Sequence, residues 1–185
     1  MIANINLPRI LRVGAGVSGQ LVTSLNELGL ARPLLVTDPF MLECGYCERL
    51  EAPLRAAGMQ YGLFSECVPD PTTDSVYAAL AQLREGDYDC VVALGGGSSL
   101  DTAKAVAVLA EHGGIMRDYK VPRQVDSGLP IIAIPTTAGT GSEATRVAVI
   151  TDTDTQEKML CMGLGLMPLA ALVDFERTLT LPYRL

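Results

Sequence analysis

Two uninterrupted apolar segments of this chain run directly into loops of small, polar residues. Residues 90–94 lead into a glycine-rich loop at 95–99, and residues 130–135 lead into a threonine- and glycine-rich loop at 136–143. An apolar run without polar alternation suits a strand that is covered on both faces, as in the middle of a parallel sheet. The pattern predicts two neighbouring central strands whose loops lie at the same, carboxyl edge of the sheet.

The rest of the chain alternates short apolar runs with segments of helical period, which is typical of successive βα units. We expect further strands at 9–13, 33–37, 59–64, 147–151, 158–161 and 171–174, a polar hairpin turn at 152–155, and helices at 17–28, 41–57, 73–85 and 99–111. The expected fold class is α/β, a Rossmann-like, mostly parallel sheet with helices on both faces. At 185 residues the chain has the length of about one domain, which we expect to span residues 1–185.

The composition argues against nucleic acid and membranes as partners. The chain has 14 Lys and Arg against 21 Asp and Glu, a net charge of −7, and so offers no basic stripe for phosphate backbones. The longest uncharged stretch of the last third, residues 159–173, is too short to span a bilayer and contains two glycines and a proline. Residues 1–11 carry no apolar run of signal-peptide length. Five cysteines, an odd number among apolar segments, favour a reduced, cytoplasmic protein.

Cys44 and Cys47 form a C-x-x-C pair, which could be a redox pair or half of a zinc site. A zinc site would need further ligands, yet the chain has one histidine, His112, and no second cysteine pair. We therefore interpret both cysteines as ordinary helix residues. His112 precedes two glycines, which predicts a place at a helix C-terminus, where a histidine interacts favourably with the helix dipole.

Two glycine motifs compete for the role of a phosphate loop. Residues 14–19 spell G-x-G-x-x-G, and Asp38 follows about twenty residues later, where a dinucleotide fingerprint places an acid for the ribose hydroxyls. The strand before that motif, 9–13, carries two arginines, whereas the first strand of a Rossmann unit is covered on both faces. We therefore expect 9–13 to be an edge strand.

The loop at 95–99, which continues to Asp101, is the stronger candidate. It follows a buried strand and opens a helix, so backbone amides and the helix dipole converge there, and glycine lets a pyrophosphate approach without a Cβ in the way. Three successive glycines also exceed what a turn requires. The structural alternative is that Ser98 and Asp101 form a capping box around a tight turn. No Gly-Lys-Ser/Thr sequence follows, which excludes a Walker-type loop.

The second loop brings four hydroxyl side chains to the expected ligand crevice. They belong to Thr136, Thr137, Thr140 and Ser142. Here too capping is the alternative, because Thr140 and Glu143 have the spacing of a capping box. Asp38, at the end of strand 33–37, could likewise be a helix N-cap. If it faces the crevice instead, its carboxylate would bind a ribose diol and repel a 2′-phosphate, which favours NAD over NADP.

These residues together resemble the iron-containing, or group III, alcohol dehydrogenase family, whose amino-terminal domain carries a Gly-Gly-Gly-Ser-x-x-Asp motif and a Thr-Thr-x-Gly-Thr-Gly-Ser-Glu loop. The matching segments are 95–101 with Lys104, 135–143, 149–152 and 36–39, and the similarity runs from about residue 8 to residue 182. The resemblance implies an NAD-binding site and implies that residues 14–19 are not its phosphate loop. The cofactor-binding residues that it implies are Asp38, Gly96, Gly97, Ser98, Asp101, Thr136, Thr137, Thr140 and Lys158.

Within that set, the resemblance implies that Gly96, Gly97 and Ser98 hold the pyrophosphate and that Asp38 holds the adenosine ribose. This chain departs from the family pattern at Asp70, where members often have Asn after Val-Pro. Members also have a second, helical domain that supplies one Asp and three His ligands to a divalent metal, iron or zinc, which polarises the alcohol or carbonyl oxygen during hydride transfer. We expect that domain to be absent, because this chain has one histidine and its segment 179–185 ends just short of the family's ligand Asp.

Three interpretations follow. The first, which we adopt, is the NAD-binding half of a metal-dependent alcohol dehydrogenase that interconverts an alcohol and an aldehyde or ketone, acts as a homo-oligomer and is inactive without its helical domain. The apolar segment 181–185, without a polar tail, favours it. The second is a stand-alone, non-catalytic dinucleotide-binding module. The third is part of a related glycerol dehydrogenase or dehydroquinate synthase-like enzyme, which use similar nucleotide domains.

Overall fold

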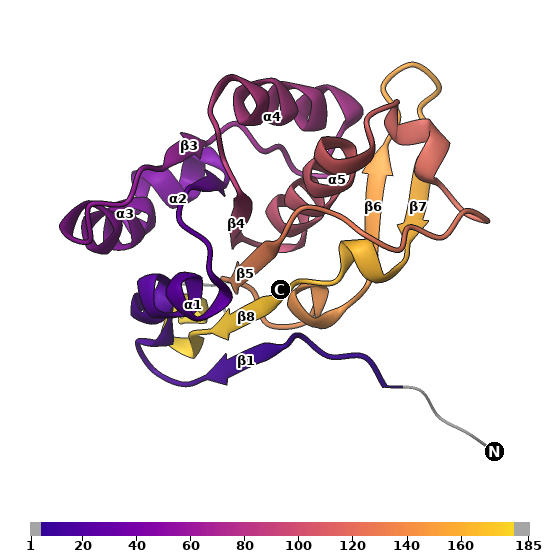
Figure 1. The fold of residues 1–185 in the computed structure, drawn as a ribbon. Helices are drawn as coiled ribbons and strands as arrows, with labels where there is room; N and C mark the ends of the chain where they lie inside the picture. Colours follow the sequence, from indigo (N-terminus) through magenta and orange to yellow (C-terminus); the bar gives the residue numbers. More distant parts are fainter. Residues whose placement is uncertain (1–4, 180–185) are drawn as a thin grey trace.

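The computed structural model describes residues 5–179, so the predicted apolar end at 181–185 lies outside the described residues. Six strands form one parallel sheet; they are β1 (Ile10–Val13), β2 (Pro33–Val36), β3 (Gly62–Phe64), β4 (Cys90–Gly95), β5 (Ile131–Pro135) and β8 (Ala170–Val173). Their order across the sheet is β1-β8-β5-β4-β2-β3 (Figure 1). The expected α/β class and parallel sheet are confirmed.

The two apolar strands predicted at 90–94 and 130–135 are neighbours in the middle of this sheet. β4 and β5 pair from Val91 with Ile131 to Gly95 with Pro135, and every residue of both strands is buried. β1 pairs only with β8 among the described strands, which confirms that it is an edge strand. The ladder between β4 and β5 therefore brings the two predicted loops to one edge of the sheet.

Helices cover both faces of the sheet, as expected. They are α1 (Leu21–Leu28) and α3 (Tyr46–Ala56) on one face, α4 (Thr73–Glu85) and α5 (Gly97–His112) on the other, and the short α2 (Pro39–Glu43) after β2. Alternate residues of β4 divide between two cores: Val91 and Ala93 pack with α4 and α5, whereas Val92 and Leu94 pack with α1 and α3. This alternation is the period of two that a pleated strand imposes.

The predicted helix at 41–57 is wrong as a single element. The structure has α2 and α3 there, separated by Gly45 at φ +71°. A left-handed backbone ends a helix, and glycine adopts it without steric cost. The predicted helix at 17–28 likewise begins with a 3-10 turn, Val17–Gln20. Thr72 is the N-cap of α4, because its Oγ1 accepts a hydrogen bond from Ser75 N at 3.3 Å.

The predicted hairpin forms a separate antiparallel pair, β6 (Val147–Thr151) and β7 (Lys158–Met162), which stands beside α5 in Figure 1. Asp152 Oδ1 closes its turn by accepting hydrogen bonds from Asp154 N and Thr155 N. The remaining short 3-10 helices are Met116–Tyr119, Ser142–Ala144, Leu164–Leu166 and Phe175–Thr178. No helix within residues 5–179 combines the length and the apolar character that a membrane crossing requires.

Candidate functional site

The glycine-rich loop joins the carboxyl end of β4 to the amino end of α5. Gly95 has φ +143°, and a Cβ there would lie 2.6 Å from Ser99 Oγ. Cβ atoms on Gly96 and Gly97 would lie 3.2 Å from the methyl groups of Thr137 and Thr140. Gly96 and Gly97 therefore let the two predicted loops pack closely together, whereas Gly95 leaves room for the side chains of Ser99 and Asp38.

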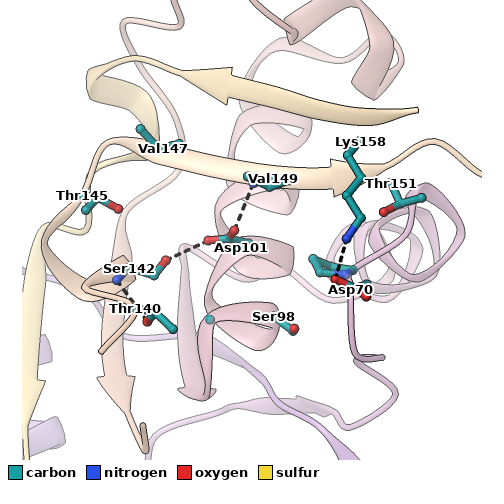
Figure 2. Close-up of a pocket in the computed structure, with 12 residues that line it drawn as sticks. Asp70, Ser98, Asp101, Thr140, Ser142, Thr145, Val147, Val149, Thr151 and Lys158 are labelled. Atoms are coloured by element: carbon teal, nitrogen blue, oxygen red, sulfur yellow. Dashed lines mark hydrogen bonds and ion pairs between the residues drawn. The ribbon is translucent and has the colours of Figure 1, made fainter. Parts of the chain in front are cut away.

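The first turn of α5, whose leading backbone amides have no partner within the helix, borders two cavities of about 650 Å³ and about 410 Å³. Gly97, Ser98 and Thr140 line both of them, so the cavities meet at the helix terminus. Asp38, Phe40, Val68, Pro69 and Thr137 are among the residues of the larger cavity. Asp70, Asp101, Ser142, Val149 and Lys158 are among those of the smaller cavity, which Figure 2 shows. A helix N-terminus at the junction of two cavities is suited to an anionic group in the middle of an elongated ligand.

Asp38 lies at the edge of the larger cavity and is also a helix N-cap. Its Oδ1 accepts a hydrogen bond from Met41 N at 3.1 Å, and its Oδ2 accepts one from Ser99 Oγ at 3.0 Å. The capping alternative is therefore correct as a structural description. It does not remove the carboxylate from the cavity, because Asp38 remains one of the residues that line it.

The hydroxyl group of Thr137 is buried at this site without a hydrogen-bond partner among the described residues. The residue lines the larger cavity. A buried polar atom without a partner is uncommon in folded proteins and calls for a group that completes it. Thr136, which was expected to offer a hydroxyl to the crevice, is instead only 3% exposed and lines neither cavity.

Asp101 ties the helix to the β6–β7 hairpin. Its Oδ1 accepts a hydrogen bond from Ser142 Oγ at 2.7 Å, and its Oδ2 accepts one from Val149 N at 3.0 Å (Figure 2). The N-cap of α5 is Gly96 without a side-chain hydrogen bond, so the capping box of Ser98 and Asp101 is wrong. Asp101 lines the smaller cavity, but both of its oxygens already have partners within the chain.

The capping box that pairs Thr140 with Glu143 is also wrong. The short 3-10 helix there has Gly141 as its N-cap, and Thr140 Oγ1 accepts a long hydrogen bond of 3.4 Å from Ser142 N. Glu143 has one buried oxygen, Oε2, without a hydrogen-bond partner. The threonine and the glutamate therefore do not close on each other as the spacing suggested.

Lys104 is a buried charge that sequence reasoning noted only as part of a motif. Its side chain is fully buried, and Nζ donates hydrogen bonds to Thr145 O, Thr145 Oγ1 and Val147 O at 3.0, 3.2 and 2.7 Å. Burial lowers the pKa of Lys104 to about 8, against the opposing charges of Asp101 and Glu143. Lys104 therefore holds the segment that leads into β6 against α5. A lysine within the apolar run of α5 was the sequence signal that could have predicted this buried charge.

Lys158 lines the smaller cavity, where its Nζ is 3.0 Å from Asp70 Oδ1 (Figure 2). It is the only basic side chain among the described residues that line either cavity. Asp70 has a left-handed backbone with φ +51°, which Asn and Asp adopt more readily than other non-glycine residues. The structure therefore brings the expected Lys158 to the site together with an acidic partner.

The other glycine motif, residues 14–19, already binds a carboxylate of the same chain. Asp174 Oδ1 accepts a hydrogen bond from Gly16 N at 3.0 Å, and its Oδ2 accepts hydrogen bonds from Ser18 N and Oγ. A carboxylate thus takes the place that a phosphate would need. This supports the expectation that residues 14–19 are not the phosphate loop.

Nothing in the described residues makes a metal centre. Cys44 ends α2 and is exposed, whereas Cys47 is buried in α3, where burial raises its pKa to about 11. His112 lies at the C-terminal end of α5, as expected. Within residues 5–179, no group of three or more His, Cys, Asp and Glu side chains is arranged to hold a metal ion.

Comparison with known proteins gives a consistent result. A family model described as iron-containing alcohol dehydrogenase matches residues 8–175. The chain is 37% identical over 174 residues to the NAD-dependent methanol dehydrogenase of Bacillus methanolicus, which covers 94% of this chain and 46% of that protein. The chain thus spans about half the length of the curated relatives it matches.

Solved structures agree. A 1,3-propanediol oxidoreductase superimposes with a TM-score of 0.93 at 29% identity, over 98% of this chain and 48% of that one. A sulfoacetaldehyde reductase from Bifidobacterium kashiwanohense, in complex with NAD+, superimposes with a TM-score of 0.90 at 33% identity, again over 98% and 48%. The similarity therefore extends across the whole described fold.

Proposed function

The chain belongs to the iron-containing alcohol dehydrogenase family, and on that premise we propose that it is the NAD-binding domain of a dehydrogenase that interconverts an alcohol and an aldehyde or ketone. The observation that carries the proposal is the amino end of α5 at the junction of two cavities, beside the unpartnered hydroxyl of Thr137. A dinucleotide has the matching chemistry, because its two halves extend to either side of a central pyrophosphate.

The backbone amides of Gly97 and Ser98, at the first turn of α5, would bind the pyrophosphate. Gly96 would leave room for that approach, since it carries no Cβ. Thr137 Oγ1 would gain the hydrogen bond it lacks in the folded chain, and Thr140 would contact the ligand where the cavities meet. A pyrophosphate bound here would thus account both for the glycine at position 96 and for the unpartnered hydroxyl of Thr137.

The adenosine half would occupy the larger cavity. Phe40, Val68 and Pro69 give that cavity an apolar wall, and the carboxylate of Asp38 would accept hydrogen bonds from the ribose hydroxyls. The nicotinamide half would then extend into the smaller cavity, toward Val149 and Lys158. In this arrangement Asp101 positions the β6–β7 hairpin that forms the cavity wall, and Thr136 supports the loop from the interior.

Bound NAD supplies hydride acceptance and donation, and the residues of this chain bind and orient it. The family resemblance also implies a divalent metal, iron or zinc, but the described residues do not fit one, because they contain no suitable group of ligands. We therefore assign no metal-dependent step to them. The small-molecule alcohol or aldehyde substrate, a homo-oligomeric assembly and a cytoplasmic location complete the proposal.

The test is calorimetric titration of the folded 185-residue chain with NAD+ and, separately, with an alcohol and NAD+ under conditions that detect NADH. We expect saturable binding of one NAD+ per chain and no turnover, because the described residues contain no group of three or more His, Cys, Asp and Glu side chains that could hold a metal for the alcohol oxygen. Absence of saturable binding to a chain that is folded by circular dichroism would overturn the proposal.

The family match supports an alcohol dehydrogenase, and the glycerol dehydrogenase and dehydroquinate synthase alternatives differ from it in their substrates. A non-catalytic binding module would also bind NAD+. Turnover of an alcohol would separate the dehydrogenase from the binding module. It is measured with added metal ions on the protein in the form that its host produces, and a binding module would stay inactive in that assay.

A further inference from the structure

Asp70 and Lys158 both line the smaller cavity and form an ion pair there (Figure 2). Its two side chains come from residues 88 positions apart, one in the loop before α4 and the other at the start of β7. Backbone contacts hold those segments side by side: Thr151 N donates a hydrogen bond to Pro71 O at 2.7 Å, and Thr151 is the β6 partner of Lys158. The approach of the two charges is therefore built into the fold.

This pair contributes little to the stability of the chain. The side chains of Lys158 and Asp70 are 62% and 78% exposed, and ion pairs so accessible to water contribute about 0 to 1 kcal/mol. The same exposure means that a ligand can break the pair at small cost. The left-handed backbone favours Asp or Asn at this position, but stability does not require the negative charge.

The charges of the residues that line the two cavities show what the Asp70–Lys158 pair can do to a ligand. Lys158 is the only cation among the described residues that line either cavity, whereas four acids line them: Asp38, Glu43, Asp70 and Asp101. An anionic ligand at the amino end of α5 therefore has one side-chain cation to attract it, and Asp70 already neutralises that cation. Any contact of the ligand with Lys158 must displace or share the carboxylate.

We propose that Asp70 competes with the cofactor for Lys158 and thereby weakens cofactor binding at this site. The inference rests on the proposed function, since it takes the cofactor to be an anionic dinucleotide bound across both cavities. Asp70 is then a residue that sets affinity through charge, and it keeps the cofactor exchangeable.

The test compares NAD+ binding by the wild-type chain and by Asp70→Asn. Asn has nearly the same shape and is equally suited to a left-handed backbone, so the variant removes the charge and leaves the loop as it is. We expect Asp70→Asn to bind NAD+ about two- to fivefold more tightly at low ionic strength. The advantage shrinks toward none at about 1 M NaCl, where the Debye length is about 3 Å.

Two further variants make the result specific. Glu157→Gln is the matched control, because Glu157 is an exposed acid next to Lys158 that pairs with Lys120 at 2.7 Å and lines neither cavity. It changes the net charge equally and should leave the affinity unchanged. In a Lys158→Met background, Asp70→Asn should give no gain, because the cation for which Asp70 competes is gone.

The outcomes separate the two proposals. Binding of NAD+ by the wild type with equal or weaker affinity in Asp70→Asn would overturn the competition, and weaker affinity would make Asp70 a direct contact. An equal gain in Glu157→Gln would also overturn it, because net charge alone would then explain the effect. Absence of NAD+ binding by every one of these folded proteins would overturn the proposed function itself, and the competition with it.

Discussion

Ser99 Oγ donates a hydrogen bond of 3.0 Å to Asp38 Oδ2, and this bond joins the first turn of α5 to the end of β2. Ser99 is buried, and the absent Cβ of Gly95 leaves the space in which the two side chains meet. The helix that presents backbone amides to the larger cavity therefore also fixes the orientation of the acid at the cavity edge. Phosphate binding and ribose selection would be coupled through this contact.

Replacement of Asp38 by Gly is expected to shift the preference from NAD toward NADP, because it removes the charge that repels a 2′-phosphate. Asp38→Asn isolates the charge, since Asn is an equally good N-cap for the bond to Met41 N. We expect the ratio of the two dissociation constants to change by about tenfold, or about 1.4 kcal/mol, in calorimetric titrations. An unchanged ratio in both variants would show that Asp38 acts only as a cap.

Replacement of Thr137 by Val is expected to weaken NAD+ binding without destabilising the free chain. The hydroxyl has no hydrogen-bond partner within residues 5–179, so its removal gives up no hydrogen bond in that part of the chain. A lost hydrogen bond to the cofactor corresponds to about 0.5–1.5 kcal/mol, or about two- to tenfold in affinity. Titration and thermal unfolding of the same samples check both halves of the prediction. Thr155→Val, in the exposed hairpin turn, is the control, and equal binding by the two variants would refute the role of Thr137.

Replacement of Gly95 by Ala is expected to destabilise the chain strongly. The backbone at φ +143° disfavours any side chain, and the added Cβ would lie 2.6 Å from Ser99 Oγ and 3.0 Å from Asp38 Oδ2. Backbone strain of this kind costs about 1–3 kcal/mol before the steric contacts are added. Gly19→Ala is the matched control, because no atom lies within 4 Å of its added Cβ and its φ is not positive. Urea unfolding should show a large loss for Gly95→Ala alone, and similar losses for both would contradict the prediction.

The buried Lys104 is expected to make stability depend on pH in the alkaline range. Its pKa is about 8 in the folded chain and 10.5 ordinarily, so between these values the unfolded state binds more protons and stability rises with pH. Below pH 8 both states carry the charge and the burial cost is complete. The unfolding free energy of the wild type, measured relative to that of Lys104→Met at the same pH, should therefore rise from pH 8 to pH 10. Parallel curves would mean that the folded lysine keeps its ordinary pKa.

Local patterns predicted the elements of this fold well. The apolar runs that became β4 and β5, and the polar turn of the β6–β7 hairpin, follow from periods of hydrophobicity that span only a few residues. The failure at α2 and α3 was also local. Gly45 interrupts an otherwise helical pattern, and a single glycine within such a pattern can be tolerated or can end the helix.

Partners of the charged groups could not be predicted in the same way. The spacing of Ser98 and Asp101 suggested a capping box, yet Asp101 accepts its hydrogen bonds from Ser142 and Val149, more than 40 residues away. Thr136 and Thr137 are adjacent in the same loop, but only Thr137 lines the cavity. Such differences depend on how the loop packs against α5, which the residue types alone do not specify.

The sheet, its central strands and the two loops at their carboxyl ends could be predicted from the residue pattern, because short-range periodicity and glycine content control local backbone structure. Which carboxylates are used within the fold, and which remain for a ligand, depends on the packing of the folded chain. Asp174 fills the first glycine motif, Asp101 secures the hairpin, and Asp70 meets Lys158 from 88 residues away. The reason is that electrostatic and hydrogen-bond partners are set by distance in space, which arises only when segments remote in the chain pack together.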